Sequence, residues 1–299
     1  MRYLFICFTC LVCSLSGQKS VVDIDALAKT GRKILEAHAY VDRKAANEKF
    51  LLALKQLLAD EETFETDLTK VNNALTLTNE AGDVKVITWQ MPDSTFSYVR
   101  FGLVAVKTRR GVVVTELKDK LKELPEIDFR RFTAEEWPGA LYYKMIPIKS
   151  KGADQYTLLG YAPSEELNRK IIDVLEVKSN GMIRFGAKVF QVETFEDKLF
   201  RKAPYRLILK YNSEYSASVQ WKEKEERIVM DHLSPSDIKL KGVYQMYGPD
   251  FTYDALYWED GWWKLDEKTR INSEQNNPIV PPNRPVGPAP KRAPSTGGN

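Results

Sequence analysis

Between residues 74 and 265 the chain is a succession of short segments rich in β-branched and aromatic residues, separated by turn-forming clusters. Such segments are typical of β-strands, and most of the connections are too short to hold crossover helices. The strongest turn signal is the dipeptide Asp260-Gly261, which is a preferred hairpin turn. The sequence therefore predicts a mainly β fold of antiparallel meanders, and it leaves a sandwich, a barrel and a propeller-like stack of sheets open.

The expected strands fall into three groups along the chain. The first group is predicted to be a four-stranded antiparallel meander, and a polar connection over residues 118–136 separates it from the second. The predicted strands are residues 74–78, 84–89, 96–107 and 112–117, then 139–148, 155–161, 170–177 and 182–189, then 205–211, 216–222, 227–232, 242–247, 253–258 and 262–265. Because no residue motif recurs at a fixed period, the sequence gives only weak support for a repeat architecture.

Ahead of the strands, residues 20–62 have a helical pattern. Apolar residues recur at spacings of three and four over residues 24–41 and again over residues 50–58. Ser20 and Asp23 resemble a capping box at the start of the first stretch. We expect either one long bent helix or a helical hairpin, packed as a prefix on the β-rich domain of residues 64–270. A dimerisation helix is the alternative, and the fold class is α+β overall.

The first 17 residues have the features of a secretory signal peptide. Arg2 supplies a positive start, residues 3–12 form a mostly apolar run, and residues 14–17 are small enough for cleavage. The apolar run is shorter than the roughly 20 residues that a membrane-spanning helix needs. The mature chain is therefore predicted to be exported, periplasmic or associated with the outer membrane, and not membrane-spanning.

All three cysteines lie inside this leader, at Cys7, Cys10 and Cys13. Cleavage therefore removes disulfides, thiolate metal sites and cysteine nucleophiles from the mature chain. A lipid anchor on Cys13 is disfavoured, because Val12 stands where lipoprotein processing generally needs a small residue.

The charge is distributed unevenly. The formal net charge is +3, but four of the cations lie in the leader and the tail, so the remainder carries about −1: Arg2, Arg284, Lys291 and Arg292. This balance argues against a nucleic-acid partner, which selects for a basic face. Seven of the fifteen prolines lie in residues 278–299. We expect that segment to be a disordered, basic, proline-rich tail.

The sequence offers little catalytic chemistry. Its two histidines, His38 and His232, exclude a histidine-rich metal site, and neither a metal nor a cofactor is predicted. His38 is expected on the apolar face of the first helix. His232 follows Asp231 on a strand, where neighbouring side chains point to opposite faces and are poorly placed to act together. Ser236 and Lys239 match a serine–lysine spacing, but in a loop rather than at a helix start. No catalytic residue is predicted.

The best candidate for ligand contact is a group of aromatic and acidic residues near the end of the β-rich domain. Aromatic faces beside carboxylates suit carbohydrate or peptide ligands, and the turn at residues 247–250 fixes their position. The candidate ligand-binding residues are Tyr247, Asp250, Tyr253, Asp254 and Trp258. Glu135 and Glu136 beside Trp137 are interpreted as charged loop residues next to a core aromatic.

Several segments, taken in order, resemble an uncharacterised family of exported proteins that is widespread in Bacteroidota. They are residues 87–92, 139–147, 156–161, 169–175, 184–190, 230–235 and 247–250. The resemblance covers residues 64 to 268 approximately and leaves out the tail. It implies a signal peptide and a setting in the cell envelope, and it carries over neither an activity nor any functional residue.

Three functions are compatible with these observations. The favoured hypothesis is a non-enzymatic binding or assembly module of the envelope that contacts a protein or a glycan. The first alternative is a carboxylate-dependent glycan hydrolase that uses Asp250 or Asp254. The second is a purely structural component of an envelope assembly, joined through its helices and its basic tail.

Overall fold

The computed structural model describes residues 23–95, 97–124, 126–149, 153–165 and 167–268. The predicted leader with its cysteines and the predicted tail at 278–299 lie outside these residues. Within them the protein is mainly β, with two helices near its N-terminal end, which confirms the predicted fold class.

The helical prefix is a hairpin. Helices α1 (Ile24–Glu36) and α2 (Tyr40–Ala59) pack against each other. Asp23 is the N-cap of α1, because its carboxylate accepts the N–H groups of the first turn at 2.9 and 3.3 Å. The chain leaves the helix at Ala37, whose ψ of 133° is extended. The predicted apolar-face position of His38 is therefore wrong, since His38 lies exposed in the connection.

None of the helices in the described ranges combines the length and the apolar character that crossing a membrane requires.

The first sheet is the predicted antiparallel meander, with strand order β1-β2-β3-β4. Its strands are β1 (Ala74–Thr78), β2 (Val84–Pro92), β3 (Tyr98–Thr108) and β4 (Gly111–Lys118). The 118–136 connection that follows holds two 3-10 turns, η1 (Ile127–Phe129) and η2 (Ala134–Glu136).

Two more sheets follow. The second has the order β12-β7-β6-β5, with β8 beside β7, and the third has the order β13-β14-β15-β16-β9, in which β9 runs parallel to β16. The strands of the second sheet are β5 (Leu141–Ile148), β6 (Asp154–Ala162), β7 (Leu167–Val177), β8 (Ile183–Phe185) and β12 (Leu207–Asn212). Those of the third are β9 (Phe190–Gln191), β13 (Val219–Lys222), β14 (Arg227–Pro235), β15 (Tyr247–Glu259) and β16 (Trp262–Asp266). The predicted turn at Asp260-Gly261 joins β15 to β16.

Three strand predictions need correction. The segment at 205–211 belongs to the second sheet, because β12 pairs with β7. The segment at 182–189 is divided at Gly186, whose φ of +93° is outside the strand region. The segment at 242–247 is a loop ending in the turn η4 (Tyr244–Met246), because Gly242 adopts a φ of +86° and the side chains of Val243 and Met246 are exposed.

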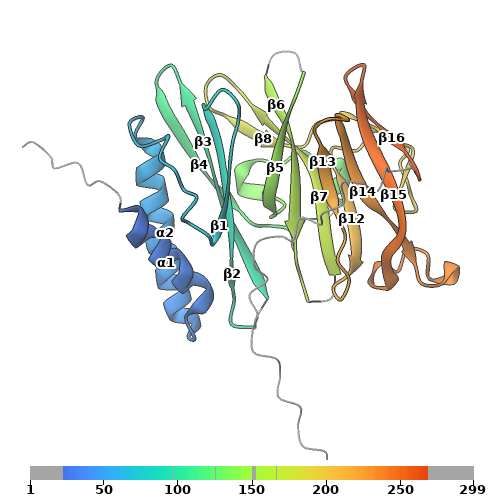
Figure 1. Cartoon of the computed structure of the whole chain (residues 1–299), viewed down its shortest axis with the longest axis horizontal. Coiled ribbons are helices and arrows are strands. Elements are labelled where there is room, and N and C mark those ends of the chain that lie inside the picture. Colours follow the sequence, from blue (N-terminus) through green and yellow to red (C-terminus); the bar gives the residue numbers. More distant parts are fainter. Residues whose placement is uncertain (1–22, 96, 125, 150–152, 166, 269–299) are drawn as a thin grey trace, which may run out of the picture.

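Figure 1 shows the helices and the three sheets stacked as four layers, with the helices at one end and the third sheet at the other. A separate apolar core fills each of the three spaces between layers. On β2, Val86 faces the second sheet, whereas Ile87 and Trp89 face the helices. The first two sheets are thus covered on both faces, which explains why their central strands are nearly continuous apolar runs.

Each space between layers also contains a buried polar contact. Between helices and first sheet, the indole N–H of Trp89 donates to Asn47 at 2.7 Å. Between the second and third sheets, the indole N–H of Trp263 donates to Thr157 at 2.9 Å. Between the first and second sheets, the hydroxyl oxygen of Thr88 on β2 accepts the backbone N–H of Tyr142 on β5 at 3.0 Å. These directional bonds fix how one layer sits on the next.

Candidate functional site

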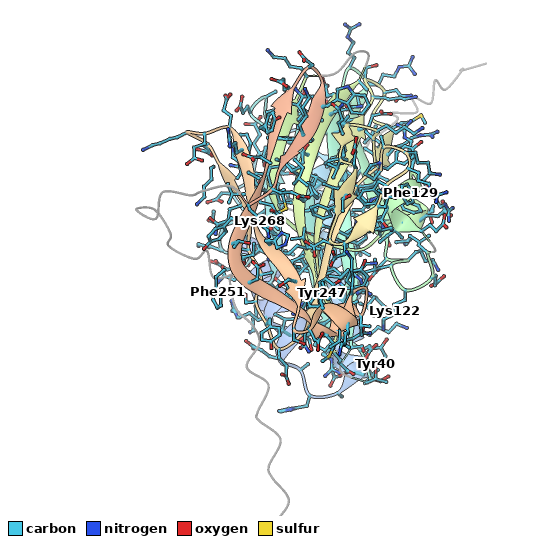
Figure 2. The ribbon with its side chains drawn as sticks, turned by 90° about the vertical axis from the view of Figure 1, so that its right-hand side faces the viewer. Tyr40, Lys122, Phe129, Tyr247, Phe251 and Lys268 are labelled. Carbon is cyan, nitrogen blue, oxygen red and sulfur yellow. The ribbon has the colours of Figure 1, made fainter. Side chains whose placement is uncertain are left out.

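The candidate site lies at an irregularity between β14 and β15. Asp231 pairs with Tyr253, but Leu233 pairs with Pro249, so His232 stands opposite three residues of β15. This bulge bends the strand and re-aims its side chains. Phe251, at its centre, has a φ of +67° and is 92% exposed. Figure 2 shows Phe251 on the third-sheet end of the molecule, together with Tyr247 and Lys268.

The bulge brings His232 between two carboxylates. Its Nδ1 atom lies 2.8 Å from Oδ2 of Asp254, and its Nε2 atom lies 4.0 Å from Oδ2 of Asp250. Oδ1 of Asp254 also accepts the backbone N–H of Lys268 at 2.9 Å, which fixes that carboxylate. The hydrogen bond to Asp254 raises the pKa of His232 above its usual value, and it outweighs the opposing effect of burial.

A third carboxyl group reaches the site from a distant part of the chain. The hairpin of β10 (Thr194–Phe195) and β11 (Lys198–Leu199) carries Glu196 and Asp197 at its tip. The Oε2 atom of Glu196 is buried and, among the described residues, has no hydrogen-bond partner. Burial raises the pKa of Glu196 well above its usual value, and the charges of Asp254, Asp197 and Asp250 raise it further. Glu196 therefore keeps its proton to higher pH than an ordinary glutamic acid does. We call Glu196, His232, Asp250 and Asp254 the acidic cluster.

Asp250 has the opposite protonation preference. Burial works to raise its pKa, but hydrogen bonds from Thr252 and the positive charges of His232 and Lys268 outweigh burial and lower the pKa. The Thr252 hydroxyl donates to Asp250 at 2.6 Å and its N–H at 3.0 Å, so the carboxylate is held in a local turn. The acidic cluster thus combines a carboxyl group whose pKa is raised, Glu196, with one whose pKa is lowered, Asp250.

Asp197 joins the hairpin tip to the segment between β14 and β15. Its carboxylate accepts the hydroxyl of Tyr247 at 2.8 Å and pairs with the ammonium of Lys241 at 2.8 Å. The Tyr247 hydroxyl in turn accepts the N–H of Gly242 at 2.8 Å. Burial and Asp197 raise the pKa of Tyr247 to about 12 against the lowering effect of the Gly242 N–H, so the phenol remains a neutral donor.

The segment between β14 and β15, which we call loop 236–246, has a firmly held backbone. The N–H of Ser236 donates to the carbonyl of Met246 at 3.0 Å and closes the loop. The side-chain amide of Asn212 donates to the carbonyl of Gln245 at 2.7 Å. Nevertheless no residue of the loop is buried, and Ile238, at 75% exposure, points into solvent with Val243 and Met246. In Figure 1 the loop extends from the lower end of β15.

The structure places the predicted ligand-binding residues in different surroundings. Asp250 and Asp254 meet at His232, and Tyr247 is connected to them through the hairpin tip. Tyr253 lies beside Asp231 over a hollow of about 20 Å³, on the other face of the strand from Asp254. Trp258 packs in the core between the second and third sheets, which we call the third core. Its ring lies 5.2 Å from that of Trp263.

The sequence interpretation of the histidine was correct in one respect. Asp231 does not pair with His232 and instead accepts the N–H of Ser218 at 2.7 Å. The actual partner, Asp254, was predicted to be a site residue, but not as the partner of the histidine. Glu196 was missed. Its only sequence signal is a charged Glu-Asp pair where a tight turn favours Asn or Gly.

The site has limited options for holding a ligand. Among the described residues, no group of three or more histidine, cysteine or acidic side chains is arranged to hold a metal ion. A larger hollow of about 180 Å³ lies elsewhere, beside Asn79, Pro147 and Tyr156. The chemistry available at the bulge is therefore proton exchange within the acidic cluster and apolar contact through the exposed side chains around it.

Comparison with known proteins gives no match: no family model, no curated protein and no solved structure is significantly similar to this chain.

Proposed function

We propose that this chain is a non-enzymatic binding module of the bacterial cell envelope that contacts a partner protein through loop 236–246 and Phe251. One observation carries the proposal: the backbone of this surface is anchored, yet its apolar side chains face solvent. An apolar surface that is held in place but left uncovered is typical of a contact site. The envelope setting rests on the predicted signal peptide and on the family resemblance.

The chemistry of the surface favours a protein over a glycan. Ile238, Val243 and Met246 are flexible or branched aliphatic side chains, which pack well against other apolar side chains. Sugars are bound instead by flat aromatic faces beside polar groups. Of the aromatic residues predicted to supply such faces, Trp258 lies in the third core and Tyr253 lies over a hollow too small for a sugar.

Exposed backbone strain supports the same interpretation. A phenylalanine with φ of +67° costs about 1 kcal/mol relative to glycine at that position. Because the ring is 92% exposed, packing within this chain does not compensate for that cost. A partner that buries the ring supplies the compensation, since a buried aromatic anchor contributes about 2 kcal/mol or more to an interface.

Site-specific photo-crosslinking in bacterial cells that export the protein to their envelope tests the proposal. A photoreactive side chain at position 238 or 251 is expected to capture one discrete protein, whereas the same side chain at Leu52 captures none. Leu52 is a matched control because it is an exposed apolar residue at the opposite end of the stack. With the captured protein purified, the double variant Ile238→Ser/Phe251→Ser should bind it at least about tenfold more weakly, and Leu52→Ser should bind it normally. Equal capture at all three positions would contradict the proposal.

A second candidate function, a carboxylate-dependent glycan hydrolase, is favoured by the split protonation of the acidic cluster. Such enzymes pair a neutral acid with an ionised carboxylate, and the raised pKa of Glu196 and the lowered pKa of Asp250 run in those two directions. The purified protein should then release reducing ends from a panel of polysaccharides, and Glu196→Gln or Asp250→Asn should abolish that release. If folded protein releases no reducing ends from any polysaccharide of the panel, this candidate is removed.

A further inference from the structure

The hairpin of β10 and β11 has an unusual attachment to the rest of the protein. Within the described residues it forms a sheet of its own, with two residues in each strand and no pairing to the three large sheets. Its tip residues, Glu196 and Asp197, have φ values of 48° and 61°. Tight hairpins favour Asn and Gly at such positions, so Glu and Asp bear a steric cost here that other contacts of the hairpin offset.

Contacts at three points hold the hairpin in place. Phe195 is buried in the third core, and Lys198 pairs with Asp128 on the 118–136 connection. Asp197 is bound to Tyr247 and Lys241, so the hairpin also holds loop 236–246. The Glu196 carboxyl lies near enough to Asp250 and Asp254 for their charges to act on it, and its buried Oε2 atom has no described partner.

The charges that face Glu196 balance only while it is neutral. The anions are Asp197 on its own hairpin and Asp250 and Asp254 on β15. The cations near these carboxylates are His232 on β14, Lys241 in the loop and Lys268 after β16. Tyr244 and Tyr247 are neutral phenols, because burial raises the pKa of both. A proton lost from Glu196 or from His232 therefore leaves an excess negative charge in a partly dehydrated space.

We propose that this hairpin is a proton-operated latch on the partner-binding surface, closed while Glu196 and His232 are both protonated and released when they lose those protons. Release frees Asp197 from Tyr247 and Lys241 and so loosens loop 236–246. This regulatory role rests on the proposed function, but the latch itself is a property of the free protein and is tested there.

The direction of the pH dependence follows from the raised pKa values. The pKa of Glu196 lies well above 4.5 and that of His232 lies above 6.5. Each proton stabilises the closed latch fully at pH values below the ordinary pKa of its group. That stabilisation is lost as the pH rises through the raised pKa of the same group. The closed state therefore belongs to acidic conditions, and the latch is released as the pH rises through the raised pKa values of the two groups.

Hydrogen–deuterium exchange of the free protein tests the latch. After correction for the intrinsic pH dependence of exchange, protection of residues 193–201 and 236–247 should fall about tenfold or more between about pH 6 and about pH 8.5. Residues 154–162 in the second sheet should keep their protection. Wild-type protection that does not change with pH in either segment would overturn the latch.

Variants assign the effect to the two groups. Glu196→Gln, which mimics the neutral acid, should reduce the loss of protection, and Glu196→Gln/His232→Gln should remove its pH dependence. Glu193→Gln, an exposed change in the same segment, should behave as wild type. A Glu196→Gln profile identical to wild type would count against the latch.

Infrared difference spectra provide a readout that needs no variant. Raising the pH over the same interval should remove the carbonyl band of a protonated carboxyl group from the wild-type protein, and an unchanged spectrum would overturn the latch. Failure of the latch leaves the crosslinking result at positions 238 and 251 unaffected. Failure of the crosslinking leaves the exchange result standing, so the two proposals can fail separately.

Discussion

At the residue scale, the environment of His232 can be measured directly. Its hydrogen bond to Asp254 raises the pKa, so the imidazole should titrate above 6.5 in the wild type and at a lower pH in Asp254→Asn. Proton NMR of the imidazole resonances checks this, because the chain has two histidines and His38→Gln assigns the other. A His232 titration that is the same in Asp254→Asn would show that the bond has no effect on it.

The buried pair of Asp173 and Arg206 gives a second prediction at this scale. Asp173→Asn leaves the Arg206 charge fully buried without a counter-charge, and removing one partner of such a pair costs about 3–5 kcal/mol. Glu223→Gln, which breaks the exposed pair with Lys144, should change the free energy of unfolding very little, because solvent screens that pair. Urea unfolding monitored by circular dichroism measures both. Equal losses would mean that burial does not decide the cost of either pair.

The residues of the acidic cluster were only half predictable from sequence. Asp250 and Asp254 are close along the chain and beside aromatic residues, which is why they were predicted as site residues. Their contact with His232 depends on a β-bulge, and no residue pattern in the sequence indicates where a bulge interrupts the strand register. Glu196 arrives from a hairpin more than 30 residues before His232, and only the folded chain shows that approach.

At the element scale, the bulge of β15 combines strain with exposure at Phe251. Glycine adopts a φ of +67° without the steric cost that Phe bears, and the exposed ring contributes little to the core. Phe251→Gly should therefore leave the free energy of unfolding within about 1 kcal/mol of wild type, while it weakens binding of the crosslinked partner. Thermal unfolding and binding measured on the same preparation check this. A variant that loses stability and keeps full binding would assign Phe251 to the fold.

The elements themselves were largely predictable, and the failures have local causes. The first meander and the β15–β16 hairpin were correctly predicted because their strands are neighbours in sequence and their turns have the expected residues. Strand β12 was assigned to the wrong group because its partner, β7, lies across a long intervening segment. The segment at 242–247 contains strand-forming residues, but only the structure shows that Val243 and Met246 face solvent while Tyr247 is buried in the core.

At the scale of the whole molecule, the order of the layers follows from which faces are apolar. The central strands of the first and second sheets are nearly continuous apolar runs, and continuous runs require cover on both faces. That requirement restricts the first and second sheets to the interior of a stack, with the helices and the third sheet outside them. It does not say which sheet contacts which, so sandwich and propeller-like arrangements were equally compatible with the sequence.

Because each inner sheet needs both of its neighbours, the stack should unfold as one cooperative unit. Phe50 on α2 is fully buried between the helices and the first sheet, with its ring 5.3 Å from that of Trp89. Phe50→Ala should cost about 3–5 kcal/mol, and the loss should appear at both ends of the molecule. Hydrogen exchange of β14 and β15, three layers away, is the decisive readout, since these strands touch neither helix in the stack. Leu52→Ala, an exposed change two residues along the same helix, should leave that exchange unaltered. If Phe50→Ala weakens only the helices and the first sheet, the layers fold as separate units, and each core stabilises only the two layers that it joins.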